Sequence, residues 1–144
     1  MKLKINNEQL ADDFFDGCRL MGIVAPVKPY QFNWQLNQAL GFQFRANNDI
    51  EIQLTKKNRT YFFSVYEYPV PARTLVHYLY CNQHEGEYLL PEFRHLDYLW
   101  LTRHDWLDEE ELQYLLQSVR RIPAVQLVNE MTHEKIKNKQ HLIL

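Results

Sequence analysis

Strand-forming segments follow one another through the middle of this chain with connections too short for a crossover helix. Residues 50–54 alternate apolar and polar side chains, and residues 60–68 are rich in aromatic and β-branched side chains. Three further runs follow at residues 74–81, 87–90 and 96–101. Because parallel strands need a connection of a dozen or more residues, this spacing favours an antiparallel meander.

Two more strands are expected outside this region. Residues 19–24 form an apolar run ended by Pro26, and residues 124–128 follow Pro123. The tail from residue 132 to 144 is polar until its last three apolar residues, so we expect its end to dock onto the body of the protein.

Two segments carry clear helix signals. Residues 29–40 are apolar over a wide arc, which predicts a substantially buried helix, and Gly41 lies at the expected C-cap. Asp108 with Glu111 three residues later forms a capping-box pattern, Leu107 and Leu112 occupy staple positions, and Pro123 prevents continuation. The buried stripe of this second helix comprises Leu112, Leu115, Leu116 and Val119. A short helix is also expected at residues 7–16, capped by Asn6 or Asn7 and ended at Gly17.

These elements predict an α+β fold, in which two main helices pack on one face of a single antiparallel sheet of about five to six strands. The 144 residues contain no Gly/Ser-rich linker and no repeat, so we expect one globular domain over residues 1–144. Hydrophobic residues make up 46% and charged residues 24% of the chain, which are typical globular values.

Charge and cysteine usage indicate the compartment. A net charge of -2 provides no global field for nucleic acid or anionic lipid, and no apolar run approaches transmembrane length. We therefore expect a cytoplasmic protein with no membrane association. Cys18 and Cys81 lack C-x-x-C spacing and are expected to be reduced, buried thiols.

One motif suggests a family. Leu90-Pro91-Glu92 followed after three residues by Leu96-Asp97-Tyr98 resembles the signature of the bacterial IPExxxVDY family, with leucine in place of the isoleucine and the valine. Segments 34–41 and 63–68 also resemble parts of that family in the same order. The family is named for its motif and has no established activity, so the resemblance implies no catalytic residue, cofactor or partner.

Glu92, Asp97 and His95 are the candidates for acid/base catalysis, since a carboxylate near an apolar or charged neighbour can be tuned for proton transfer. The alternative is structural. Pro91 removes a ladder donor, and an aspartate at the start of a strand accepts backbone N–H groups and fixes a turn. We favour the structural role and lean away from an enzyme.

Metal and thiol sites find little support. The six histidines are scattered without ligand spacing, so we expect no metal and no cofactor. Cys81 and His77 share a strand face but lie about 13 Å apart along an extended strand, beyond hydrogen-bond reach.

Aromatic residues suggest a binding role. Tyr98 and Trp100 share a strand face with Leu96, and two helices would not easily cover both faces of such a sheet. An uncovered Tyr- and Trp-rich face would bind a protein or a second copy of the chain. We therefore expect a binding or adaptor domain that self-associates through this face, with Pro91, Glu92, Asp97, Tyr98 and Trp100 at or near the functional surface. The alternatives are a small acid/base enzyme and an RNA-associated protein that uses Tyr98, Trp100 and the lysines at 135, 137 and 139.

Overall fold

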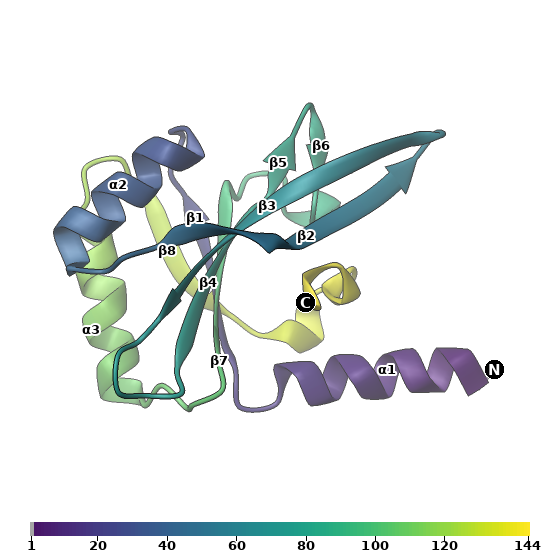
Figure 1. Ribbon diagram of the computed structural model, residues 1–144, viewed down its shortest axis with the longest axis horizontal. Coiled ribbons are helices and arrows are strands. Elements are labelled where there is room, and N and C mark those ends of the chain that lie inside the picture. The colour runs from purple at the N-terminus through teal and green to yellow at the C-terminus, as the bar shows by residue number, and fades with distance from the viewer. Residues whose placement is uncertain (1) are drawn as a thin grey trace.

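The computed structural model describes the backbone of residues 2–144 and the side chains of residues 9–144. Six strands form one antiparallel sheet in the order β2-β3-β4-β7-β1-β8, and two short strands pair as a separate hairpin (Figure 1). The sheet strands are β1 (Arg19–Val24), β2 (Arg45–Lys56), β3 (Arg59–Pro69), β4 (Val76–Cys81), β7 (Tyr98–Arg103) and β8 (Leu127–Met131). The hairpin consists of β5 (Gln83–His84) and β6 (Glu87–Tyr88).

Helices lie on both sides of this sheet. Figure 1 shows α2 (Pro29–Leu40) and α3 (Glu109–Arg120) together on one side, and α1 (Lys2–Phe15) with the C-terminal segment on the other. Short 3-10 turns occur at η1 (Pro91–Phe93), η2 (His133–Lys135) and η3 (Lys139–Leu142). The predicted α+β class, with an antiparallel sheet and two helices on one face, is confirmed. No helix within residues 2–144 is long and apolar enough to span a bilayer.

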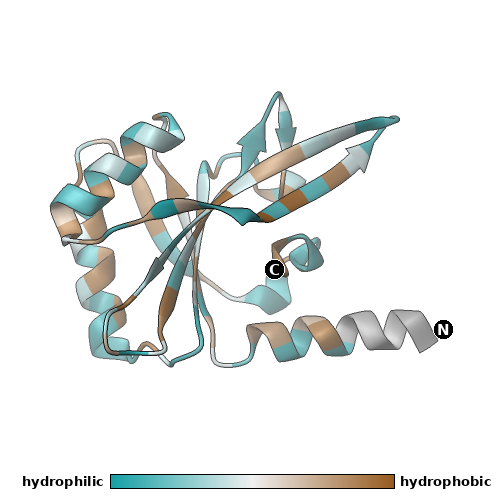
Figure 2. Cartoon of the chain, viewed as in Figure 1, coloured by the Kyte–Doolittle hydropathy of each residue, from teal (hydrophilic) through white to brown (hydrophobic). Residues whose placement is uncertain are grey.

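The local signals explain the best-formed elements. Lys57 and Asn58 both have positive φ, at 52° and 63°, which is the conformation that suits a tight turn between twisted strands. Alternating hydrophobic and hydrophilic residues mark β2 beside this turn (Figure 2). At α3, the Asp108 side chain accepts a hydrogen bond from the Glu111 amide at 2.8 Å, as predicted. The Glu111 carboxylate pairs with Arg73 at 2.7 Å instead of completing the capping box.

Both faces of the sheet are buried. On the face towards α2 and α3, Met21, Ile23 and Trp100 pack against Phe32 and Leu116. On the opposite face the core consists of side chains from the strands, from α1, from the segment before β7 and from the tail: Phe15, Leu20, Tyr80, Leu89, Leu90, Leu99, Leu101, Ile136 and Leu142. The tail docks as expected, and the Tyr80 hydroxyl donates to the Leu142 carbonyl oxygen at 2.7 Å.

Several element boundaries differ from expectation. α1 runs through Asn6 and Asn7, because a cap signal is weak beside good helix formers such as Lys2 and Leu3. β6 ends at Tyr88, since Leu89 and Leu90 leave the hairpin to enter the core. The last strand begins at residue 127 instead of 124, because the chain first turns after α3, where the Val125 amide donates to the Ile122 carbonyl.

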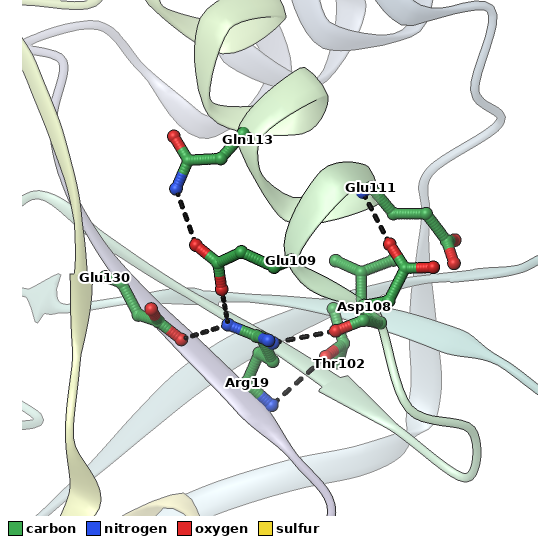
Figure 3. Close-up of polar contacts among 8 residues, drawn as sticks. Arg19, Thr102, Asp108, Glu109, Glu111, Gln113 and Glu130 are labelled. Carbon is green, nitrogen blue, oxygen red and sulfur yellow. Dashed lines mark hydrogen bonds and ion pairs between the residues drawn. The ribbon is translucent and has the colours of Figure 1, made fainter.

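A buried arginine joins three elements at one end of the sheet (Figure 3). Arg19 begins β1 and is only 8% exposed; its Nε donates to the Leu107 carbonyl oxygen at 2.7 Å. Its Nη1 pairs with Glu109 of α3 at 3.1 Å and Glu130 of β8 at 3.0 Å. The guanidinium also lies 4.3 Å from the centre of the Trp106 ring. Arg19 therefore fixes the start of α3 against β1 and β8.

We expect Arg19→Ala to lower the free energy of unfolding by about 2 kcal/mol, because it removes charge-assisted hydrogen bonds and leaves the Leu107 carbonyl unpaired. Arg19→Lys keeps the charge and recovers only part of this loss, since an ammonium lacks the fork geometry. Urea unfolding would measure both, with Arg45→Ala on exposed β2 as the control. Equal stability of Arg19→Ala and Arg45→Ala would contradict this role.

Candidate functional site

The motif segment before β7 is organised by Asn82, a fully buried side chain directly after β4. Its Nδ2 donates to the carbonyl oxygens of Phe93 at 3.0 Å and Leu96 at 2.8 Å, and its Oδ1 accepts from the Leu90 amide at 2.8 Å. The backbone N–H of Asn82 also donates to the backbone carbonyl of Asp97, and the backbone carbonyl of Asn82 accepts from the backbone N–H of Leu89. One side chain thus satisfies the backbone of a segment that lacks regular pairing. Asn82 is absent from the sequence-predicted site, since a polar residue before a turn gives no distinctive signal.

Glu92 holds the tail in place. Its carboxylate accepts from the backbone amide of Asn138 at 2.8 Å and from the Asn138 side chain at 3.0 Å. Partial burial acts to raise the pKa of Glu92, but these hydrogen bonds outweigh it and lower the pKa below its ordinary value. Pro91 begins η1, a position where its missing N–H costs nothing, and His95 is exposed.

Asp97 has a separate structural role at the end of β1. Its Oδ2 accepts from the Ala25 amide at 2.8 Å, and its own amide donates to the Ile23 carbonyl. Asp97 thus accepts a backbone N–H, but from the end of β1 and not from the adjacent turn that the sequence suggested. Glu92 and Asp97 therefore have different partners, and Arg94 lies over the Tyr88 ring.

Tyr98 and Trp100 do not form an exposed surface. They are 2% and 0% exposed beneath α2 and α3, so the predicted self-association through an aromatic sheet face is wrong. The error came from expecting two helices to leave this face uncovered, whereas α2 and α3 pack directly on it. Leu96, expected on the same face, packs on the opposite one, because β7 begins at Tyr98. The RNA alternative also loses these residues as a stacking platform.

The most exposed aromatic side chains lie instead on the helices. Tyr30 and Trp34, one turn apart on α2, are 66% and 65% exposed, and Tyr114 of α3 is 75% exposed. The wide apolar arc of α2 is therefore only partly buried. A hollow of about 550 Å³, here called the outer hollow, lies between the two helices and is lined by Trp34, Gln35, Gln38, Ala39, Tyr114, Ser118, Arg121, Ile122 and Pro123.

A second cavity, here called the His77 pocket, adjoins the outer hollow and shares Ala39, Tyr114 and Ser118 with it. It occupies about 490 Å³ between the end of α2, α3 and the β3–β4 end of the sheet. Its lining includes Leu40, Phe42, Tyr68, Arg73, Leu75, His77, Leu107, Glu110, Glu111 and Leu115.

His77 is 3% exposed, and its tautomer is fixed by Trp100. The indole Nε1 of Trp100 donates to His77 Nδ1 at 2.9 Å. Because an indole N–H can only donate, Nδ1 carries no proton and the neutral ring carries its proton on Nε2. Burial, and secondly the charge of Arg73, lower the pKa of His77 to about 4.

Neither cysteine is an activated thiol. Burial raises the pKa of Cys81 to about 12, and burial also raises the pKa of Cys18, whose Sγ donates to the Phe14 carbonyl. Among the residues that the structure describes, no three histidine, cysteine, aspartate or glutamate side chains gather as a metal site.

Comparisons with protein-family models, curated proteins and solved structures found no match. The resemblance to the IPExxxVDY family therefore stays a prediction.

We expect Asn82→Ala to lower the free energy of unfolding by about 3 kcal/mol, because it leaves buried backbone groups of the motif segment without partners. Asn82→Asp is also destabilising at neutral pH, since a carboxylate cannot donate to Phe93 and Leu96. Chemical denaturation would measure both changes, with exposed Asn48→Ala as the control. A loss no larger than that of Asn48→Ala would show that the hydrogen bonds of Asn82 are dispensable.

Acidification tests the buried state of His77. Its pKa falls from the ordinary value of 6.5 to about 4 on folding, so the unfolded chain takes up this proton first. The contribution of neutral His77 to the free energy of unfolding is fully present above pH 6.5. As the pH falls towards 4, the free energy of unfolding decreases by about 3 kcal/mol through this group. His77→Gln keeps a neutral acceptor for Trp100 and removes this dependence. Urea unfolding of both proteins at about pH 7 and pH 4 would measure it, and parallel losses would contradict the prediction.

Proposed function

We propose that this chain is a protein-binding domain that recognises its partner through the outer hollow between α2 and α3. The observation that carries the proposal is the gathering of exposed Trp34, Tyr114 and Arg121 around one concave surface. Tryptophan, tyrosine and arginine are the residue types most enriched among interface hot spots. The binding role expected from the sequence is thereby moved from the sheet to the helices.

The polar groups of the outer hollow define the chemistry of the partner. Arg121 is exposed at the end of α3, and among the described residues it has no ion-pair partner. Arg121 is also the only charged residue that lines this hollow among residues 9–144. A partner segment with a carboxylate next to an apolar side chain would complement both Arg121 and the Trp34 and Tyr114 rings. We therefore propose an acidic, apolar peptide segment as the partner.

A buried acceptor in the hollow supports a hydrogen-bonding partner. The Gln35 Oε1 atom is buried and has no hydrogen-bond partner among the described residues. Buried polar atoms without partners are uncommon in folded proteins, and Gln35 lines the hollow. A backbone N–H of a bound peptide would satisfy it.

The other two functions have less support. Glu92 and Asp97 are engaged with Asn138 and Ala25, so no observation joins them into an acid/base pair. The lysines at 135, 137 and 139 lie on the tail, where Lys139 pairs with Asp12 at 3.8 Å. Neither group is joined to a cavity or to exposed aromatic rings.

Selection of peptides from a random display library on the purified protein would test this function. We expect enriched peptides to share an acidic residue near an apolar one, and we expect Trp34→Ala, Tyr114→Ala and Arg121→Glu each to weaken binding at least about tenfold. Leu10→Ala, which removes a 60% exposed apolar side chain from α1, is the matched control and should bind normally. Because all four side chains are exposed, none of these changes disturbs the core.

Two results would overturn the proposal: no peptide enriched over a blank surface, or peptides that bind wild type and Trp34→Ala equally. Light scattering of the protein without peptide would measure its molar mass and so detect self-association. A dimer that Trp34→Ala dissociates would place a second copy of the chain on this surface and contradict the proposed peptide partner.

A further inference from the structure

The His77 pocket has the size and composition of a small-molecule site, and its histidine and most of its apolar lining lie outside the outer hollow. Its volume of about 490 Å³ lies within the usual range of ligand pockets, which are apolar with a few placed polar groups. Leu40, Phe42, Tyr68, Leu75, Leu107 and Leu115 form its apolar wall. Phe42 stacks on Tyr68 with ring centres 4.5 Å apart, which gives one side of this wall a rigid aromatic surface.

His77 contributes a hydrogen-bond donor to this largely apolar space. His77 is almost fully buried, and Trp100 occupies its Nδ1. The Nε2 atom has no hydrogen-bond partner among residues 9–144, and it is not one of the unpaired atoms sealed from solvent. Because the ring lines the pocket, its Nε2–H is available to a molecule inside. A donor left unpaired in an apolar pocket favours a ligand that supplies an acceptor.

The charges around the pocket disfavour an anion. Arg73 at the rim is already paired with Asp105 at 2.9 Å and Glu111 at 2.7 Å. Glu110, also at the rim, has no ion-pair partner among the described residues. A carboxylate ligand would lose its water, meet no free cation and face the charge of Glu110. An uncharged acceptor such as a carbonyl oxygen avoids these costs.

We propose that the His77 pocket binds a small, uncharged, apolar molecule whose carbonyl-type oxygen accepts a hydrogen bond from His77 Nε2–H. The apolar wall supplies most of the affinity, and the histidine fixes the orientation. Because Trp100 holds the imidazole in one tautomer, the donor is preorganised before the ligand enters.

Three probes of similar size separate the parts of this proposal: acetophenone, benzoate and ethylbenzene. Titrations of the ¹⁵N-labelled full chain would follow the indole N–H signal of Trp100, which lies next to the binding group. We expect acetophenone to shift this signal saturably and to bind about fivefold more tightly than ethylbenzene, as one net hydrogen bond allows. We expect benzoate to bind at least about tenfold more weakly than acetophenone.

Three variants test the named groups. Glu110→Lys reverses the charge at the rim of the pocket, on the first turn of α3, so it should strengthen benzoate binding several-fold relative to acetophenone binding. His77→Phe should abolish the preference for acetophenone over ethylbenzene; His77→Gln, which can donate from its amide, should keep part of it. Melting temperatures establish which variants are folded, and Glu110→Lys provides a test even if both His77 variants unfold.

Absence of a saturable Trp100 shift up to the solubility limit of acetophenone would overturn the proposal. Equal binding of acetophenone and benzoate to the wild type would also overturn it. Trp34→Ala distinguishes the two sites, since it should impair peptide binding in the outer hollow while acetophenone still binds.

Discussion

Burial of β7 on both faces is the constraint on which the rest of the structure depends. Tyr98 and Trp100 point towards α2 and α3, while Leu99 and Leu101 point to the opposite side, and all four are at most 2% exposed. A strand with two apolar faces requires a covering layer on each side. The helices provide one layer. The second is built from α1, the Asn82-bound segment and the tail held by Glu92, which explains why so many side chains near the motif are engaged with backbone groups.

The same constraint determines where recognition can occur. Once the aromatic face of the sheet is buried, the exposed aromatic area that remains includes the outer surfaces of α2 and α3, around Trp34 and Tyr114. The His77 pocket lies where these helices meet the β3–β4 end of the sheet. Strand residues such as His77 and helix residues such as Glu110 therefore both line it. A buried neutral histidine and an exposed arginine thus serve two adjoining sites of different chemistry.

Local signals in the sequence predicted much of the fold. Residues 19–24, the helix at residues 29–40, and the Asp108 cap were predicted correctly because caps, glycine stops and apolar periodicity act over a few residues. The turn at Lys57 and Asn58 lies between the two strands predicted at residues 50–54 and 60–68. Asp97 was expected to accept a backbone amide of the adjacent turn, and it accepts that of Ala25 at the end of β1 instead.

The candidate site was harder to predict because it depends on contacts between distant segments. The hydrogen bond between Trp100 and His77 joins residues 23 positions apart, and nothing local marks it. The burial of Tyr98 and Trp100 follows from helices whose packing face had to be known first. Exposure of Trp34 depends on which part of a wide apolar arc meets the sheet, and periodicity alone leaves that choice open.

Solvent accessibility of the tryptophan indole groups tests the central claim most directly, namely that the sheet face is covered and the helix surface is free. Addition of a soluble paramagnetic agent to ¹⁵N-labelled protein should broaden the indole N–H signal of Trp34 strongly and leave that of Trp100 sharp. The half-exposed Trp106, beneath which Arg19 lies, serves as an internal reference. Broadening of Trp100 to the level of Trp34 would show an open sheet face and contradict the account.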